Sequence, residues 1–549
     1  MSIKLDITRK GYYYILLDGV EVSRHVSESE SIAKGFETKS NNKDKEVRLT
    51  RPDSLFDVEI NAFDDCDEQI NALNTEIEIL LEQIELLKEE DDDDSGVVIP
   101  VDVSELKAFP SAIGAAAYID IFHNSPTILH VTSLADGTSN DVGTLRWAIQ
   151  NTINKTLNRI VVFDVSGVIN LNSQIYASNG AGDEGGYTGS IYIAGQSAPK
   201  GGITISGDRI RLVEFETIIV RYLKFRNDGT YDGSIAVRAH NEIIDHCSVS
   251  HVTNSTGISM AAMQSGDLSK GTFSNNLMGQ CSYAFILGET TPNASRQLED
   301  ASFTVARNAY YNVGWRVPFK GGSAIKVDAI NNLVHNWSDR LIRMDGHPYK
   351  LNHFQNYYQA GGNTTNQLLW SSYLNAENPP EIYTNDNFLE YDSRGSFSKP
   401  IGFDDNESVA WTQFQDNFVA LPSSYFMSTP HPVHNPETFT ILNNLDLKEE
   451  LLPLVGASKY IKDDGTAGVY RDEYDTSFVN GININDSSTR NSTLVLPIAS
   501  LYRTRSDFYL NNPHIPEVWF VANVPNGQDH NDLSPNGYTW LEEYLNQVD

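Results

Sequence analysis

A segment centred on asparagine recurs along this chain at a fixed spacing, and this repeat is the strongest constraint on the fold. Asn308, Asn332 and Asn356 hold the same position in three similar segments that follow one another at 24 residues. An earlier segment places Asn276 in the same phase. Periods of about 20 to 50 residues are typical of solenoids, in which each repeat forms one coil. We therefore predict stacked coils with a ladder of hydrogen-bonded asparagines at one turn.

Strand-forming residues precede each of these asparagines, and from about residue 127 no long helical pattern interrupts them. Short runs of β-branched residues alternate with Gly, Asn and Asp, which favour turns. Strands that repeat once per coil stack in parallel and align their aliphatic side chains inside the solenoid. The sequence therefore predicts an all-β protein built on a right-handed parallel β-helix. The runs in question are 218–220, 243–244, 303–305 and 325–327.

The sequence pattern changes three times along the chain, which divides it into four segments. Residues 1–61 alternate apolar and polar and contain an Asp18-Gly19 turn, so we expect a small β module, for which the resemblance described below implies a role in attachment. Residues 62–96 form a predicted coiled coil with an acidic linker, and 97–126 a connecting segment. The β-helix with its C-terminal segment is expected over 127–549.

The predicted coiled coil has apolar residues at steps of three and four, which fill the a and d positions of a heptad repeat. An amphipathic helix packed on its own domain would also bury such a stripe, but unbroken heptads favour self-association. Ile at a with Leu at d nominally prefers two strands, so the heptads alone leave the oligomeric number open. The residues are Phe63, Cys66, Ile70, Leu73, Ile77, Leu80, Ile84 and Leu87.

Charge and hydropathy exclude several classes of function. The chain has 73 acidic against 40 basic residues, a net charge of −33, which argues against binding to nucleic acid. An acidic substrate would therefore need a local basic site. We find no apolar stretch that suggests a signal peptide or a membrane span, and three cysteines cannot form a disulfide framework.

From residue 127 to 549 the chain resembles the pectate lyase family. The resemblance lies in a series of motifs in the family's order: Gly-Thr-Leu-Arg-Trp-Ala-Ile at 143–149, Asp-His-Cys at 245–247, Arg-Val-Pro at 316–318 and Asn-Leu-Val-His-Asn-Trp at 332–337. It implies a parallel β-helix that cleaves acidic, uronate-containing polysaccharides by β-elimination. The N-terminal region is not part of it. A β module and coiled coil before such a β-helix are similar to bacteriophage tailspike depolymerases, which implies a homotrimer attached to a virion tail protein, and a virion or extracellular location.

The resemblance also assigns candidate site residues. The first arginine of the Arg-x-Pro motif, Arg316, implies the base that removes the C5 proton, with Lys320 as the second basic residue. Tyr283 stands near the position where the family has a lysine, and is also a candidate catalytic residue. Arginine alone is a poor base because its pKa is about 12 or higher, so positive neighbours must assist. We expect Arg307, Arg340, Arg343 and Trp315 to bind the substrate, through carboxylate pairs and ring stacking.

The calcium site implied by the family departs from its pattern in this chain. Asp232 remains, but Gly233 and Asn254 stand where further acidic ligands are expected. Asp245 is a second candidate metal ligand, or a buried partner of His246. Calcium takes about six to eight oxygen ligands, so calcium is at most a possible cofactor here.

Two alternatives remain open at this stage. The departures from the family pattern would suit a glycan-binding spike without catalytic activity. A glycoside hydrolase on the same solenoid would instead need a pair of carboxylates about 5 Å apart, or about 6.5 to 9.5 Å apart. The pairs to test are Asp339 with Asp345 and Asp232 with Asp245.

Overall fold

The computed structural model divides the chain into two compact units, Met1–Ile99 and Pro100–Asp549. In the first unit it describes five strands within residues 2–62. In the second it describes residues 106–119, 126–153, 157–178, 189–227, 234–253, 256–262, 269–287, 301–321, 325–338, 341–346, 349–364, 370–374, 379–390, 414–416 and 419–549 without 487, 492, 498 and 511.

The first unit contains one five-stranded sheet in the order β3-β2-β1-β5-β4. β1 pairs antiparallel with β2 and parallel with β5. β2 and β3 contain the runs expected from alternation, on either side of Asp18-Gly19. The predicted coiled coil from Phe63 to Leu87 lies outside the described residues. The strands are β1 (Ser2–Arg9), β2 (Tyr12–Leu17), β3 (Val20–Val26), β4 (Lys45–Thr50) and β5 (Asp57–Ala62).

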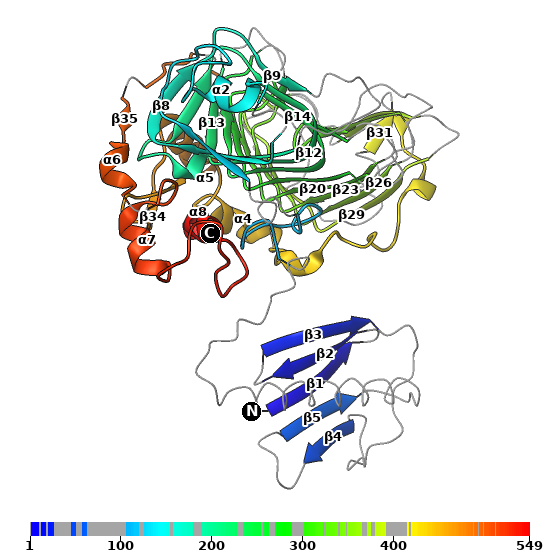
Figure 1. The fold of residues 1–549 in the computed structure, drawn as a ribbon. Helices are drawn as coiled ribbons and strands as arrows, with labels where there is room; N and C mark the ends of the chain where they lie inside the picture. The colour runs from blue at the N-terminus through cyan, green and yellow to red at the C-terminus, as the bar shows by residue number, and fades with distance from the viewer. Residues whose placement is uncertain are drawn as a thin grey trace. The chain divides into compact units, whose positions relative to one another are not determined.

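The second unit is a parallel β-helix, which confirms the predicted fold (Figure 1). Its coils contribute strands to three parallel sheets, and the long strands β12 and β14 bend from the first sheet into the second. Sheet 1 contains β9 (Ile175–Ser178), the first parts of β12 (Ile210–Arg221) and β14 (Ile235–Asp245), β16 (Thr256–Ala262), β19 (Tyr283–Leu287), β22 (Lys320–Gly321), β25 (Ile342–Gly346), β28 (Trp370–Leu374) and β31 (Phe414–Asp416).

Sheets 2 and 3 follow sheet 1 in each coil. Sheet 2 contains β6 (Thr127–Val131), β7 (Arg159–Phe163), β10 (Ser190–Ala194), the second parts of β12 and β14, β17 (Lys270–Ser274), β20 (Ala301–Ala306), β23 (Ile325–Ile330), β26 (Lys350–Phe354) and β29 (Glu381–Asn385). Sheet 3 contains β8 (Val165–Asn170), β11 (Ile203–Ser206), β13 (Leu223–Arg226), β15 (Ser248–Ser250), β18 (Leu277–Gly279), β21 (Ala309–Tyr311), β24 (Leu333–His335), β27 (Tyr357–Gln359) and β30 (Phe388–Glu390).

The predicted asparagine ladder is confirmed at the turn between sheets 2 and 3. The side-chain amides of Asn276, Asn308 and Asn332 each donate to the side-chain oxygen of the next asparagine at 3.0 Å. Asn356 donates in the same way to Asn387 at 2.8 Å, a fifth member. All five are buried, so each bond satisfies polar groups that water does not reach. The ladder therefore fixes the register of successive coils.

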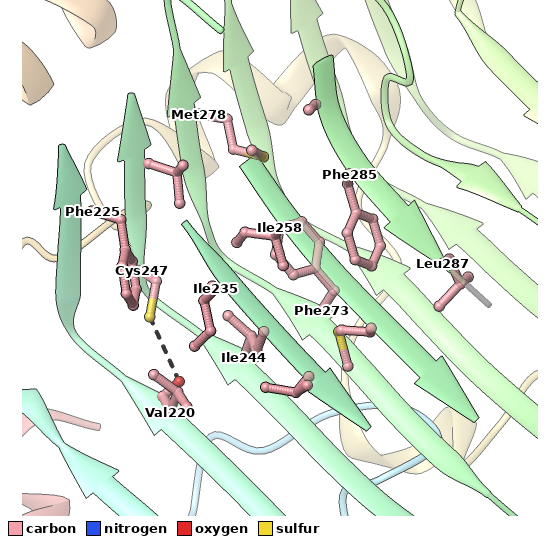
Figure 2. Close-up of a cluster of buried hydrophobic side chains, with 14 of the residues drawn as sticks. Val220, Phe225, Ile235, Ile244, Cys247, Ile258, Phe273, Met278, Phe285 and Leu287 are labelled. Carbon is pink, nitrogen blue, oxygen red and sulfur yellow. Dashed lines mark hydrogen bonds between the residues drawn. The ribbon is translucent and has the colours of Figure 1, made fainter. Parts of the chain in front are cut away.

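The interior of the solenoid is filled by aliphatic, aromatic and sulfur-containing side chains from all three sheets (Figure 2). In sheet 1, alternate residues such as Ile258, Phe285 and Leu287 point into this core. Because side chains alternate along a strand, the intervening residues of sheet 1 face outward. The short helix α2 (Leu145–Gln150) adds Leu145 and Ile149 to the same core.

The outer faces of sheets 2 and 3 are covered by other parts of the chain. Residues 106–119, expected as a mere connection, pack Phe109 on sheet 2, where Trp519 and Trp540 join them. On sheet 3, Phe478 packs against strand residues such as Leu277. The covering helices are α4 (Leu447–Leu451), α5 (Glu473–Asn483), α7 (Glu517–Asn523) and α8 (Trp540–Leu545).

The outer face of sheet 1 differs from the other two. Among the described residues, no buried hydrophobic cluster joins it to a helix. The C-terminal segment instead returns to the first coils, where β35 (Leu501–Tyr502) pairs with β8 (Figure 1). No helix in the described part of the chain has the length and apolar character needed to cross a membrane.

Candidate functional site

Three of the predicted site residues contact one another where the chain enters sheet 1. The guanidinium carbon Cζ of Arg316 lies 4.5 Å from the ring centroid of Tyr283 and 5.7 Å from that of Trp315. The two rings lie 5.1 Å apart, and their backbones form a parallel bridge between adjacent coils. All three residues are half-buried.

The backbone of Arg316 has a conformation that sets it apart from the turns of the solenoid. Its φ is +63°, in the left-handed region that side chains other than glycine rarely adopt. Other left-handed residues recur coil after coil, as at Asn275, Asn331 and Gln355 just before the ladder. Arg316 belongs to no such series, and it lies between sheet 3 and sheet 1. Such isolated outliers are frequent at functional sites.

Two further predicted residues lie side by side on the next strands. Lys320 in β22 is paired in register with Arg343 in β25. Adjacent strands lie about 4.8 Å apart, so these two basic residues occupy neighbouring register positions. Lys320 follows Arg316 by four residues in the chain, and Arg343 lies one coil further on. Arg316, Lys320 and Arg343 are therefore candidates for the local basic site that an acidic ligand requires in a chain whose net charge is −33. For Lys320 only the backbone is described.

Sequence reasoning missed two further pairs on sheet 1. Arg238 in β14 donates to Glu214 of β12 at 3.1 Å. Arg211 in β12 lies over the ring of Tyr176 in β9, with 5.1 Å from Cζ to the centroid. Each pair joins two strands that belong to neighbouring coils, and the chain segments that connect these strands differ in length. Only a reliable strand register, which the sequence does not provide here, could have found them.

The structure places Arg307 at another turn of the solenoid, so its contacts do not support its expected role in substrate binding. Arg307 is the left-handed residue just before Asn308, at the turn between sheets 2 and 3. Its guanidinium donates to the carbonyl of Thr440 at 2.6 Å and lies 5.6 Å from the ring of Phe439. Burial lowers its pKa. Arg307 therefore braces the segment that crosses sheet 2, away from sheet 1.

Asp245 is likewise occupied by internal contacts. One carboxylate oxygen accepts from Arg221 at 3.0 Å and contacts His246 at 2.7 Å. The other accepts from Ser274 and Asn275. Nearby positive charge and these hydrogen bonds hold the pKa of Asp245 far below its usual value despite burial. These contacts support the alternative interpretation of Asp245 as a buried partner of His246, and the ligand role stays a prediction.

The remaining predicted residues are not placed by the structure. Asp232, Arg340 and Asp339 lie outside the described residues, and for Asp345 only the backbone is described. Within the described part of the chain, no group of three or more His, Cys, Asp and Glu side chains could hold a metal ion. Of the two carboxylate pairs considered for a glycoside hydrolase, Asp232 with Asp245 does not suit hydrolysis, because Asp245 is buried.

Comparison with curated proteins finds fungal relatives that are each named probable pectate lyase C. That of Emericella nidulans is 26% identical over 331 residues, which covers 59% of this chain and 69% of the relative. That of Neosartorya fischeri is 30% identical over 272 residues, covering 48% and 56%. That of Aspergillus flavus is 25% identical over 463 residues, covering 81% and 94%. No family model matches the chain. The chain is thus distantly similar to proteins named as pectate lyases.

Two solved structures are also similar. The major cedar pollen allergen Jun a 1 matches with a TM-score of 0.37 and 16% identity, over 62% of this chain and 93% of the allergen. A pectate lyase variant from Xanthomonas campestris matches with a TM-score of 0.34 and 14% identity, over 64% and 98%. Both scores are low, and the β-helix is established by the strand pairing of the chain itself.

Proposed function

We propose that this protein is a polysaccharide lyase that cleaves an acidic, uronate-containing polysaccharide on the outer face of sheet 1. The observation that carries this proposal is the position of Arg316, which contacts Tyr283 and Trp315 at the entry to sheet 1, the one sheet whose outer face no described helix covers. The distant similarity to proteins named as pectate lyases supports the same reaction.

The reaction is a β-elimination, and it sets two requirements for the site. A base takes the proton from C5, the C4–O bond breaks with its electron pair on the glycosidic oxygen, and a C4–C5 double bond forms. The carboxylate attached to C5 must be neutralised, because the departing proton leaves negative charge beside it. The base must lie within hydrogen-bond reach of the C5 proton.

Arg316 meets the requirement for the base. A guanidine that has lost its proton can accept the C5 proton, and positive neighbours favour that neutral form because like charges repel. In this proposal such charges come from Lys320, four residues after Arg316 in the chain, and from Arg343, its register partner. The rings of Tyr283 and Trp315 hold the guanidinium plane in place, which limits the loss of side-chain freedom on substrate binding.

Lys320 and Arg343 meet the requirement for neutralisation. An arginine binds a carboxylate through two parallel hydrogen bonds, whereas a lysine acts as a point charge. The positions that would supply calcium ligands carry Asp232, Gly233 and Asn254, of which only one is a carboxylate. This set does not fit an ion that takes about six to eight oxygens. The proposed reaction therefore uses cationic side chains and has no step through calcium.

The test is to incubate the protein with a panel of uronate polymers and to follow ultraviolet absorbance from unsaturated sugar ends. The panel includes polygalacturonate, alginate, hyaluronan and acidic bacterial capsules, with an uncharged polymer as the negative control. We expect absorbance to rise with at least one acidic polymer and not with the uncharged one. Lys270→Ala serves as the control for loss of a surface cation away from sheet 1, because Lys270 is exposed at the start of β17 in sheet 2.

Two other outcomes would overturn the proposal. Reducing ends that form without the absorbance would indicate hydrolysis. Binding of an acidic polymer with neither signal would indicate a glycan-binding spike without catalytic activity.

We further propose that the chain assembles into a homotrimer through the heptads from Phe63 to Leu87 and attaches to a phage tail through its N-terminal unit. The unbroken heptad pattern, which must bury its Ile and Leu side chains, supports self-association, and the number of three rests on the similarity to tailspike depolymerases. The separation of Met1–Ile99 from the β-helix as a compact unit is consistent with a module for attachment.

A further inference from the structure

We infer that Tyr176 and Arg211 form a distal subsite that binds one acidic sugar unit of a long polymer, remote from the bond that is cleaved. This inference rests on the proposed function and extends it, because it predicts a preference for polymers over short oligosaccharides. It is carried by contacts and strand register on the outer face of sheet 1.

The two side chains form an exposed platform. Tyr176 is 40% exposed, which is unusual for an aromatic residue in a strand of this solenoid, and Arg211 is exposed beside it. The guanidinium carbon lies 5.1 Å from the ring centroid. A sugar ring can stack on an exposed tyrosine, while the adjacent guanidinium binds its carboxylate. Tyr176 thus suits the ring of a uronate unit, and Arg211 suits its carboxylate.

The charge of Arg211 is available to a ligand. Among the described residues no carboxylate lies within ion-pair distance of it, whereas Glu214 on the same strand is taken by Arg238 at 3.1 Å. In a chain of net charge −33, a solvent-exposed arginine that forms no ion pair with a described carboxylate can attract anions.

Strand register connects this platform to the candidate catalytic face. Arg211 is in register with Ala236, Ala236 with Ser259, Ser259 with Ile286, and Ile286 with Lys320. Lys320 is therefore four strand-to-strand steps from Arg211, or about 19 Å at about 4.8 Å per step. The three intervening register positions carry no charged residue. A polymer that runs across the strands reaches both ends, whereas a disaccharide or trisaccharide does not.

The experiment compares wild-type protein with Arg211→Ala and Tyr176→Ala on two substrates, the preferred acidic polymer and its trisaccharide. Both side chains are exposed, so neither variant opens the core, and Lys270→Ala is the control for loss of a surface cation. For the polymer we expect KM and the dissociation constant to rise about fivefold, with kcat unchanged. For the trisaccharide we expect kcat/KM to stay at the wild-type value. The polymer effect should shrink at high salt, because salt screens exposed charges.

Equilibrium binding of the polymer is measured separately from turnover, so that the two proposals can fail separately. If Arg211→Ala binds the polymer as tightly as wild type, the subsite is wrong, whether or not the protein is a lyase. If it loses turnover equally on polymer and trisaccharide, Arg211 acts at the reacting bond or on the fold, and the subsite is also wrong. If polymer binding weakens as expected but the wild type forms no unsaturated ends, the subsite stands and the lyase proposal fails.

Discussion

The guanidinium of Arg316 lies over the ring of Tyr283, with Cζ 4.5 Å from the ring centroid, although 33 residues separate the two in the chain. The parallel stacking of β19 on the following coil produces this contact, which the backbone bridge from Tyr283 to Trp315 fixes in register. A cation that stacks on a ring keeps its planar face in one orientation. The relationship therefore links coil packing to the geometry of the proposed base.

Replacing Tyr283 tests whether this stack positions Arg316. Tyr283→Phe keeps the ring and should retain most of the turnover, whereas Tyr283→Ala removes the platform and should lower kcat about tenfold or more. Equal losses in both variants would show instead that the hydroxyl group takes part in the reaction. Initial rates of formation of unsaturated ends on the preferred polymer measure the difference.

Replacing Lys320 separates substrate binding from chemistry. For Lys320→Ala we expect KM to rise more than kcat falls, because the lost charge binds carboxylate in both the ground state and the transition state. Treatment with a calcium chelator should cost less activity than loss of Arg316, since the site offers few oxygen ligands. Complete inactivation by the chelator alone would assign the neutralising charge to a metal.

His353 predicts how stability depends on pH. It lies in the core, where it contacts the hydroxyls of Tyr358 at 2.6 Å and Thr384 at 3.0 Å, and burial lowers its pKa to about 3. The unfolded chain protonates this histidine below about pH 6.5 while the folded protein does not. Unfolding is therefore favoured as pH falls from about 6.5 toward 3.

His353→Gln removes the one proton that the unfolded chain binds at this position and the folded protein does not. Between about pH 4 and 5.5, the slope of unfolding free energy against pH should fall by about 1.4 kcal/mol per pH unit relative to wild type. Urea titrations at several pH values measure it. Identical slopes in the two proteins would mean that His353 is protonated in the folded state as well.

The heptads predict self-association, and the resemblance to tailspikes implies a trimer. Light scattering of the intact protein at micromolar concentration should give three times the 61.1 kDa mass of one chain. Without residues 1–96 the β-helix should remain folded, because solenoid coils contact mainly their neighbours. A 61.1 kDa particle for the intact protein would disprove the proposed trimer.

The repeat made much of the fold predictable. The equal 24-residue spacing predicted that Asn308, Asn332 and Asn356 belong to the ladder. Asn387 follows Asn356 after 31 residues, so the spacing did not predict it. The position of Arg307 at a turn could not be predicted, because a left-handed turn residue leaves no signature when it is neither glycine nor asparagine. Residues 106–119 were not recognised as part of the core, since small residues such as Ala116 show no periodicity.

The site was predictable only where a motif marked it. Arg316 and Lys320 stand in one short motif, and Tyr283 was found by its place in the preceding coil. The pairing of Tyr176 with Arg211 depends on how two unequal coils stack, which local sequence does not encode. Asp245 is the opposite case, because an acidic residue within a family motif can also serve burial and hydrogen bonding.

The most direct test of the central claim is the turnover of Arg316→Lys on the preferred polyuronate. Lysine keeps the positive charge but loses the planar group that stacks on Tyr283, so it cannot occupy the same position relative to C5. We predict that kcat falls at least about 100-fold while the affinity for the polymer stays close to that of wild type. Turnover near the wild-type value would contradict the assignment of Arg316 as the base.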